Sequence, residues 1–264
     1  MRCAWILILS ACVADKPALP QLDFAAYGDC RDGHDVHRSI CTSILATGAK
    51  FVVSTGDLVG SPDFEQDWVK FREITRELRA KVGYYAAPGN HDVSDRRPFE
   101  MEFGLEKTYF EKRIGDVHLF LLDSNSYFSD AEQLQWLEER AKASDARHKF
   151  AAFHHPPFLF ETWGDSTIRD RIHPLLLRLK FCAVFCGHHH SFYTTTRDGL
   201  RYVVTAGGGA PLYGVDAAQA HPRDQFKNIH HYVGCRMLAN KIAAQVFNPD
   251  GREEPDLAFT LCEH

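Results

Sequence analysis

Hydrophobic positions recur along the chain with two spacings that alternate from segment to segment. Short apolar runs bounded by turn residues are typical of buried strands, and apolar positions three or four residues apart are typical of amphipathic helices. The segment 63–78, for example, carries Phe64, Trp68, Phe71 and Ile74 at helical spacing. The pattern predicts strands at 22–27, 51–53, 84–87, 150–153 and 181–185, and helices at 36–47, 63–78, 131–143 and 167–179.

Hairpin signals join this alternation and dominate the C-terminal third. Asp198-Gly199 is a strong two-residue turn between apolar runs at 192–196 and 200–205. Further hairpins are predicted at 108–114 with 117–122 and, closing the sheet, at 231–238 with 241–247. The fold class is therefore α/β, an α+β sandwich in which two packed mixed β-sheets are flanked by helices. With no linker or repeat after residue 20, residues 21–264 are predicted to form a single domain.

The first 20 residues have the pattern of an export signal followed by a tether. Arg2 precedes the apolar run 5–9, which is too short to span a bilayer. The stretch Leu9–Cys12 (LSAC) resembles a bacterial lipobox, which implies cleavage before Cys12 and acylation of its thiol. The alternative is an ordinary signal peptide cleaved after Ala14. We expect a protein exported to the periplasm or the cell exterior, attached to a membrane by a lipid on Cys12.

The amino-acid composition excludes some classes of function and indicates another. The 264 residues are 45% hydrophobic and 25% charged, as in an ordinary globular protein. A net charge of −5 and the absence of a Lys/Arg block argue against a nucleic-acid partner, which needs a basic face. The unusual count is 15 histidines, several of them clustered, which points toward metal chemistry.

Six of the eight cysteines lie beyond the export segment. An even number in an exported chain permits disulfides. Cys182 and Cys186 would share one strand, where four residues span about 13 Å and exceed disulfide reach. We expect both to be buried free thiols. The cysteines also lack paired C-x₂-C spacing, which argues against a structural zinc site.

Polar residues that can bind metals stand beside glycine or proline at the ends of successive predicted strands. Open α/β sheets build their sites at the carboxyl ends of strands. Each residue has an ordinary alternative, such as a turn former or a helix cap, but their order along the chain is hard to obtain by chance. The candidates are Asp29, Asp57, Asn90, His154, His188 and His190.

This series resembles the calcineurin-like metallophosphoesterase superfamily, and most nearly its purple-acid-phosphatase-like branch. The matching motifs are GDCR at 28–31, GDLV at 56–59, GNHD at 89–92, HHP at 154–156 and GHHH at 187–190. The resemblance implies a two-sheet sandwich with a dinuclear metal site at the strand C-terminal edge. It also implies that the chain hydrolyses a phosphate ester.

The resemblance further implies a role for each residue. Asp57 would bridge the two ions, and Asp29 and His190 would complete the ligands of the first. The second ion would be completed by Asn90, His154 and His188. His91 would lie beside the ions without binding them and would give a proton to the leaving group.

The chemistry of this ligand set agrees with those roles. Mixed nitrogen and oxygen ligands suit Mn, Fe or Zn rather than Ca. A carboxylate can bridge two cations about 3.5–4 Å apart, and a metal-bound hydroxide can attack phosphorus near neutral pH. We therefore predict a hydrolase acting on a small-molecule phosphate ester, either a monoester or a diester. The alternative is a degenerate relative that binds metal without turnover, although a pure binder has no need of His91.

Two positions depart from the patterns of relatives. Gly60 stands where purple acid phosphatases carry a tyrosinate ligand, so a purple iron site is not expected and the first ion has few protein ligands. His34 or His37 could compensate, or could lie on a surface loop and a helix face. His155 and His189 are next to predicted ligands but should point elsewhere in an extended chain.

Arg31 is the second departure, because many relatives have histidine two residues after the first aspartate. Its guanidinium could clamp two phosphoryl oxygens, and we predict a catalytic role for it. The alternative is a surface ion pair with Asp32 or Asp35, which would contribute little.

Overall fold

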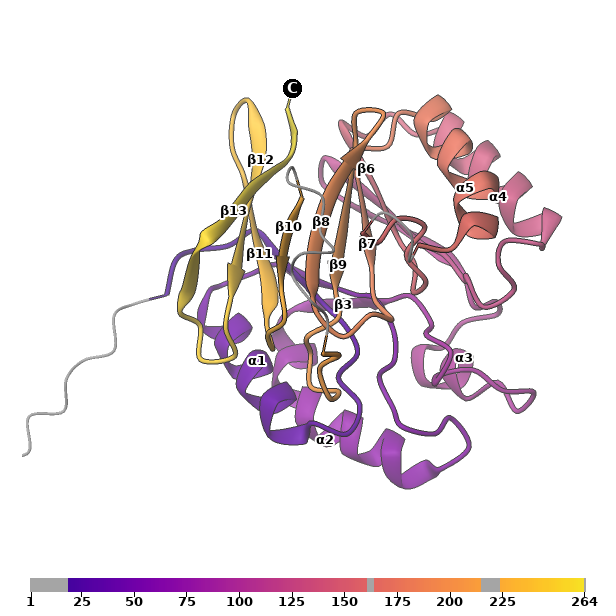
Figure 1. The fold of residues 1–264 in the computed structure, drawn as a ribbon. Coiled ribbons are helices and arrows are strands. Elements are labelled where there is room, and N and C mark those ends of the chain that lie inside the picture. The colour runs from indigo at the N-terminus through magenta and orange to yellow at the C-terminus, as the bar shows by residue number, and fades with distance from the viewer. Residues whose placement is uncertain (1–18, 161–163, 215–223, 264) are drawn as a thin grey trace, which may run out of the picture.

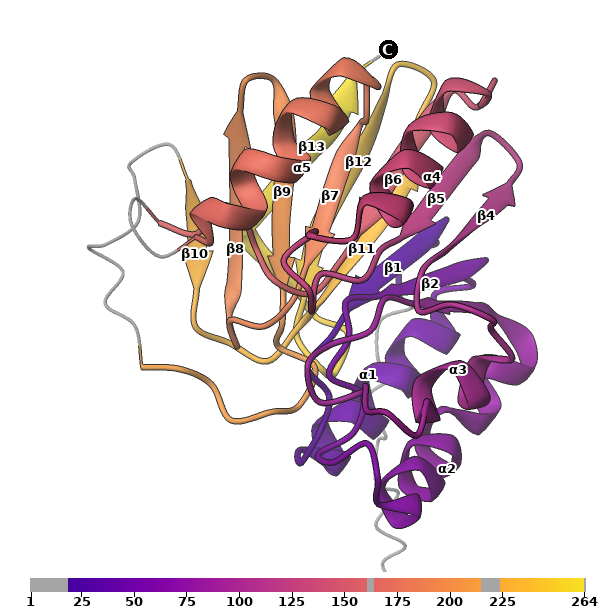
Figure 2. The same ribbon diagram turned by 90° about the vertical axis from the view of Figure 1, so that its right-hand side faces the viewer.

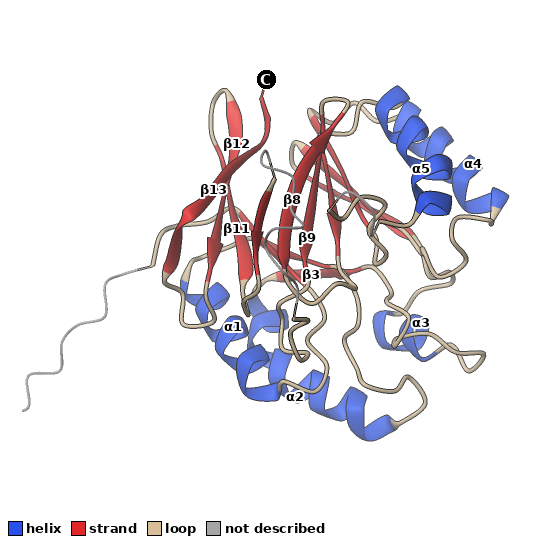
Figure 3. Cartoon of the chain, in the orientation of Figure 1, coloured by secondary structure: helices blue, strands red, loops and turns tan. Residues whose placement is uncertain are grey.

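The computed structural model describes residues 19–160, 164–214 and 224–263. Two β-sheets pack face to face, and helices cover the outer face of each sheet (Figures 1, 2 and 3). The predicted sandwich of two mixed sheets is thus confirmed. The predicted export segment lies almost wholly outside the described residues. No helix in the described ranges is both long enough and apolar enough to cross a bilayer.

The first sheet has the strand order β13-β12-β11-β1-β2-β3. Strands β1, β2 and β3 are parallel, and the other three pair antiparallel. Its strands are β1 (Phe24–Tyr27), β2 (Phe51–Ser54), β3 (Gly83–Ala86), β11 (Tyr232–Met237), β12 (Lys241–Phe247) and β13 (Glu253–Glu263).

The second sheet has the strand order β10-β8-β9-β7-β6-β5-β4. Strands β5, β6, β7 and β9 are parallel, so this sheet too directs the carboxyl ends of its central strands to one edge. Its strands are β4 (Phe110–Ile114), β5 (Val117–Leu121), β6 (His148–Ala152), β7 (Ala183–Cys186), β8 (Phe192–Arg197), β9 (Leu200–Thr205) and β10 (Gln225–Lys227).

The apolar stripes of the helices account for the outer layers. Helices α1 (His34–Ala46) and α2 (Glu65–Lys81) bury their stripes against the first sheet, and α4 (Ala131–Lys142) and α5 (Ser166–Arg178) bury theirs against the second. Asp130 caps the N-terminus of α4, because its side chain accepts a hydrogen bond from the Glu132 amide. A short helix, α3 (Pro98–Phe103), was not expected within the loop after β3.

Aromatic side chains fill the space between the sheets. Phe24 on β1 stacks on Phe51 of the same sheet, with ring centroids 4.8 Å apart. It also meets Phe150 and Phe185 of the second sheet at 5.6 and 6.2 Å. These contacts join the inner faces of the two sheets and thereby fix how the sheets lie against each other.

The last strand, β13, is a difference from the sequence prediction. The β11–β12 hairpin forms as expected but does not close the sheet, because β13 pairs along the outer side of β12. Leu257 and Leu261 are buried on β13, with the partly buried Phe259 between them packed against the same core, whereas Pro255 is exposed. Proline is tolerated in an edge strand, where its missing N–H faces solvent.

A disulfide joins the two sheets through this strand. Cys262 on β13 bonds Cys182, which directly precedes β7, across a sequence separation of 80 residues. The expectation that Cys182 is a free thiol is therefore wrong, because its partner comes from the strand that the pattern missed. Cys186 is buried and free, as expected.

Replacing both Cys182 and Cys262 by serine is expected to lower the free energy of unfolding by about 2–4 kcal/mol, because a long loop of the unfolded chain is released. The melting temperature should fall by roughly 5–15 °C. Thermal denaturation of the oxidised protein and the double variant measures the difference. A reducing agent should destabilise the parent protein and leave the variant unchanged. Equal melting temperatures for all samples would contradict the bond's contribution.

Candidate metal centre

The predicted ligands converge where the carboxyl ends of five parallel strands meet. Three follow strands of the first sheet, since Asp29 comes after β1, Asp57 after β2 and Asn90 after β3. The other three follow strands of the second, since His154 comes after β6, and His188 and His190 come after β7. Residues that are far apart along the chain thus lie together at one edge of the two-sheet sandwich.

Strained backbone turns the ligand side chains toward one another. Asp29, Asp57 and His188 have φ values of 56°, 54° and 68°, in the left-handed region that non-glycine residues seldom adopt. Neighbouring glycines keep the space open. A Cβ on Gly89 would lie 2.2 Å from an Asp57 oxygen, and one on Gly187 would lie 2.6 Å from an Asp29 oxygen. Such strain persists where the surroundings hold it and often marks functional sites.

One group of potential ligand atoms comes from Asp29, Asp57 and His190, whose atoms lie within 4.8 Å of one another. All three side chains are buried. His190 Nδ1–H donates to the Pro211 carbonyl at 2.7 Å, which leaves Nε2 unprotonated and 3.4 Å from Asp29 Oδ1. Among the residues that the structure describes, this buried Nε2 has no hydrogen-bond partner. A lone pair aimed at two carboxylates is the arrangement of a metal ligand.

A second group adjoins the first and comes from His154 and His188, with Asn90 beside them. His154 Nδ1–H donates to the Thr55 carbonyl at 2.9 Å, so its Nε2 faces Asp57 Oδ1 at 3.4 Å and Asn90 Oδ1 at 3.1 Å. His188 Nδ1 lies 3.2 Å from both Asn90 Oδ1 and His154 Nε2. Acceptor atoms that crowd together in this way suit a shared cation.

His155 differs from the sequence expectation. It belongs to the second group, because one of its ring nitrogens lies within 4.8 Å of nitrogens of His154 and His188. Its Nδ1 is 2.9 Å from Ser124 Oγ, and its ring centroid is 4.6 Å from that of His188. The chain turns before Pro156 instead of staying extended, so His155 stays at the centre. His189 does point elsewhere, toward Ser191 Oγ at 2.9 Å.

Electrostatics at the two carboxylates also fits a cation. Burial raises the pKa of Asp29 well above its usual value, although His154 acts in the opposite direction. Burial acts on Asp57 too, but His154 and the His91 amide outweigh it and lower the pKa of Asp57. Burial and the neighbouring His154 lower the pKa of His188 to about 4, so this imidazole is neutral at pH 7. Two buried acids beside neutral imidazoles form a donor set for transition metals.

Asp92 is a positioning residue that sequence reasoning did not assign. Its buried carboxylate accepts hydrogen bonds from the amides of Asp57 and Gly89, both at 2.8 Å, and of Leu58 at 2.7 Å. It therefore ties the turn after β2 to the turn after β3. The signal was available, because an aspartate side chain can accept a hydrogen bond from the backbone amide three residues before it.

His91 lies beside both groups and belongs to neither. Its amide donates to Asp57 Oδ1 at 3.0 Å, and its Nδ1–H donates to the Gly60 carbonyl at 2.8 Å. These two bonds fix the ring and leave Nε2 as its free nitrogen. The side chain is half-buried, so that nitrogen is compatible with contact to a bound molecule.

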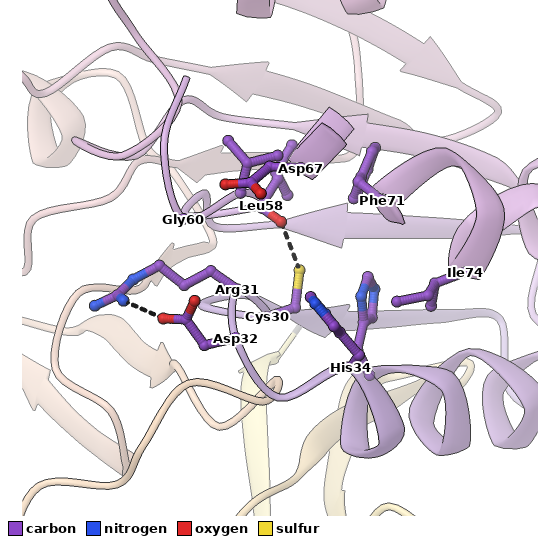
Figure 4. A pocket seen from close by; sticks show the side chains of 11 residues that line it. Cys30, Arg31, Asp32, His34, Leu58, Gly60, Asp67, Phe71 and Ile74 are labelled. Carbon is purple, nitrogen blue, oxygen red and sulfur yellow. Dashed lines mark hydrogen bonds and ion pairs between the residues drawn. The ribbon is translucent and has the colours of Figure 1, made fainter. Parts of the chain in front are cut away.

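Arg31 forms the ion pair with Asp32 that was the alternative for it, and it also lies near a candidate ligand. Nη1 pairs with Asp32 at 2.6 Å, while Nε lies 3.5 Å from Asp57 Oδ2 and the side chain is only 18% exposed. Figure 4 shows the Arg31–Asp32 pair beside a cavity of about 50 Å³, which His34 and Gly60 also line. Neither group of ligand atoms includes His34 or His37. His37 is buried against the Tyr27 hydroxyl at 3.0 Å, on the helix face.

Comparison with known proteins identifies the fold and the family. The family model for calcineurin-like phosphoesterases matches residues 23–192. A tartrate-resistant acid phosphatase type 5 of Sus scrofa is 22% identical over 65% of this chain and 62% of its own length. A probable glycerophosphodiester phosphodiesterase of Arcobacter nitrofigilis is 28% identical over 61% of this chain and 66% of its own length. The chain thus spans slightly less than two thirds of these two relatives.

Solved structures share the architecture at low sequence identity. A purple acid phosphatase from yellow lupin superposes with a TM-score of 0.77 over 93% of this chain and 54% of its own, at 14% identity. GAP50, described as the anchor in the inner membrane complex of Plasmodium, superposes with a TM-score of 0.74 over 93% of this chain and 90% of its own, at 11% identity. The family model covers well over half of the sequence, and we conclude that the chain belongs to the calcineurin-like phosphoesterase family.

Proposed function

We propose that this protein is a metal-dependent phosphoesterase that hydrolyses a small-molecule phosphate ester at a dinuclear centre. The observation that carries the proposal is the pair of adjoining ligand groups, one from Asp29, Asp57 and His190 and one around His154 and His188. Membership of the family supports the same reaction class.

The proposed centre holds its ions through the six residues predicted from the sequence. Asp57 faces both groups of ligand atoms. It belongs to the first group together with Asp29 and His190, and one of its oxygens lies near His154 of the second group. Two ions such as Mn, Fe or Zn, when bound, would supply Lewis acidity and an activated water. The protein's own task is to orient the phosphate and to deliver a proton to the leaving oxygen.

His91 is proposed to deliver that proton from Nε2. Its Nδ1–H is engaged by the Gly60 carbonyl, so the proton available for transfer is the one that Nε2 carries in the imidazolium. The amide bond to Asp57 keeps the ring next to the centre without making it a ligand. A positioned proton donor of this kind contributes about 10²–10⁴ in rate.

Arg31 is proposed to bind the phosphoryl oxygens. Replacing Arg31 by alanine should leave the metal content unchanged and lower kcat/KM by about 10- to 100-fold, because a charge-assisted contact to the substrate is lost. Arg31→Lys should recover only part of that loss, since an ammonium cannot make a paired contact. Asp32→Asn controls for the neighbouring ion pair. Wild-type kinetics in Arg31→Ala would assign the side chain to that ion pair alone.

The direct test is a substrate panel. The purified protein is stripped with a chelator, reloaded with Mn²⁺, Zn²⁺ or Fe²⁺, and assayed on phosphomonoesters, phosphodiesters and nucleotides. Hydrolysis that appears only with metal, at a stoichiometry near two ions per chain, supports the proposal. Metal binding with no turnover on any substrate would favour the second candidate, a binding protein.

Export and lipid attachment are proposed as well. The disulfide between Cys182 and Cys262 supports an oxidising compartment. Cys12 lies outside the described residues, so its acylation rests on the LSAC stretch. Mass spectrometry of the mature N-terminus from native membranes should find a diacylated or triacylated Cys12. An unmodified N-terminus at Asp15 would instead match cleavage after Ala14.

A further inference from the structure

The metal centre opens to solvent on the side of its second ligand group. Asn90 and His188 are exposed, whereas Asp29, Asp57 and His190 are buried. When the phosphate group of a substrate lies at the centre, the rest of the substrate must therefore extend over Asn90 and His188. The side chains next to these two residues are thus placed to contact the leaving group.

A row of rings lines this opening. Tyr127 is 47% exposed, and its ring stacks on that of His155, with centroids 5.9 Å apart and planes 29° apart. The His155 ring in turn lies 4.6 Å from the His188 ring. The row thus runs from the candidate ligand outward to a tyrosine with a large exposed area.

The chain holds Tyr127 in place at an energetic cost. Tyr127 and Phe128 both have φ values of 54°, which is unfavourable for bulky residues. Phe128 is buried against Phe153, with ring centroids 5.2 Å apart, while Tyr127 is directed outward. Arg171 Nη1 donates to the Tyr127 carbonyl at 2.7 Å and secures the turn.

Ser124 fixes the other half of the stack. Its hydroxyl accepts from the His155 amide at 3.0 Å and lies 2.9 Å from His155 Nδ1. The Tyr127 amide donates to the Ser124 carbonyl at 2.9 Å, so one turn positions both rings. Asn125 connects the same turn to the Gly89 carbonyl beside the centre, at 3.4 Å. The stack is therefore formed before any substrate binds.

We propose that Tyr127 and His155 form an aromatic platform that binds a planar ring in the leaving group of the substrate. The substrate class is then a phosphate ester of a ring-bearing alcohol, such as a nucleoside. This inference rests on the proposed phosphoesterase function and adds the part of the substrate that the metals do not contact. Base-on-aromatic stacking tolerates different bases, because every base has a π-face.

The test compares two substrates that differ only by the ring, adenosine 5′-phosphate and ribose 5-phosphate. The metal-loaded wild type should have the higher kcat/KM with adenosine 5′-phosphate. Tyr127→Ala should lower that preference about tenfold, and Tyr127→Phe should retain it, because stacking needs the ring and not the hydroxyl. Leu238→Ala is the matched surface control. Leu238 is 42% exposed on the β11–β12 turn, at the opposite end of the sheet from the centre.

A binding measurement separates failure of the platform from failure of the function. The dissociation constants of the same two compounds are measured by calorimetry on the metal-loaded His91→Ala protein, with and without Tyr127→Ala. If Tyr127→Ala changes both constants and both kcat/KM values by the same factor, the platform is wrong and the phosphoesterase stands. If the wild type hydrolyses no phosphate ester, the proposed function fails. The platform is then tested by binding alone: Tyr127→Ala should weaken binding of adenosine 5′-phosphate more than binding of ribose 5-phosphate, and an equal effect on both would rule the platform out.

Discussion

The Asp57→Asn variant is expected to lose both metal ions and, with them, all measurable phosphoesterase activity. Asp57 has one oxygen 3.4 Å from His154 Nε2 and shares the first ligand group with Asp29 and His190. It is thus the carboxylate that faces both groups. A neutral amide can still accept the His91 N–H but cannot bridge two cations.

Elemental analysis of the reloaded variant measures this loss, and thermal denaturation shows whether the fold persists. Asp63→Asn is the matched control, because Asp63 is an exposed carboxylate that accepts a hydrogen bond from the Ser94 hydroxyl. That control should retain two ions and full activity. Full occupancy in Asp57→Asn would rule out a bridging role and require a different division of the ligands.

The His91→Ala variant should keep both ions and lose about 10²–10⁴-fold in kcat. The ring belongs to neither ligand group, and its Nδ1–H donates to the Gly60 carbonyl, which leaves Nε2 for the proposed proton transfer. The loss should be much smaller with 4-nitrophenyl phosphate than with an alkyl phosphate, because nitrophenolate needs no proton in order to leave.

Metal analysis and the leaving-group comparison separate the alternatives for His91. Loss of an ion on substitution would make it a ligand. An equal loss with both kinds of leaving group would make it a residue that orients the phosphate. Asp92→Asn is a comparison variant for His91→Ala, because Asp92 holds the same turn through hydrogen bonds from the amides of Asp57 and Gly89.

The strands and their terminal motifs could be predicted from the sequence, because apolar runs followed by Gly-Asp or Gly-Asn report a local preference. The six candidate ligands could be grouped for the same reason, since parallel strands end at one edge. Their roles stay predictions. What was missed depends on long-range contacts, and β13 is the clearest case. Its apolar residues follow the charged stretch 252–254 and Pro255, and pairing with β12 makes it a strand.

The errors at Cys182 and His155 follow from the same limit. The partner of Cys182 is 80 residues away on the unpredicted strand, so no local pattern could name it. His155 was expected to point away because strand residues alternate, but the turn before Pro156 and the hydrogen bonds to Ser124 bring it back to the centre. Departures from regular geometry occur where a site is built, and periodicity does not report them.

If a library of variants were selected for heat resistance alone, the selection would favour variants that have lost residues of the metal centre. Asp29, Asp57 and His188 have left-handed φ values of 56°, 54° and 68°, at which glycine avoids a penalty of roughly 1–2 kcal/mol per residue. Glycine substitutions there would relieve this backbone strain in the metal-free chain and erase its ligands. Sorting in the presence of metal reverses the ranking, because an ion that binds only the folded chain favours every variant that still holds it. Directed evolution of this scaffold should therefore keep the metal in the selection buffer from the first round.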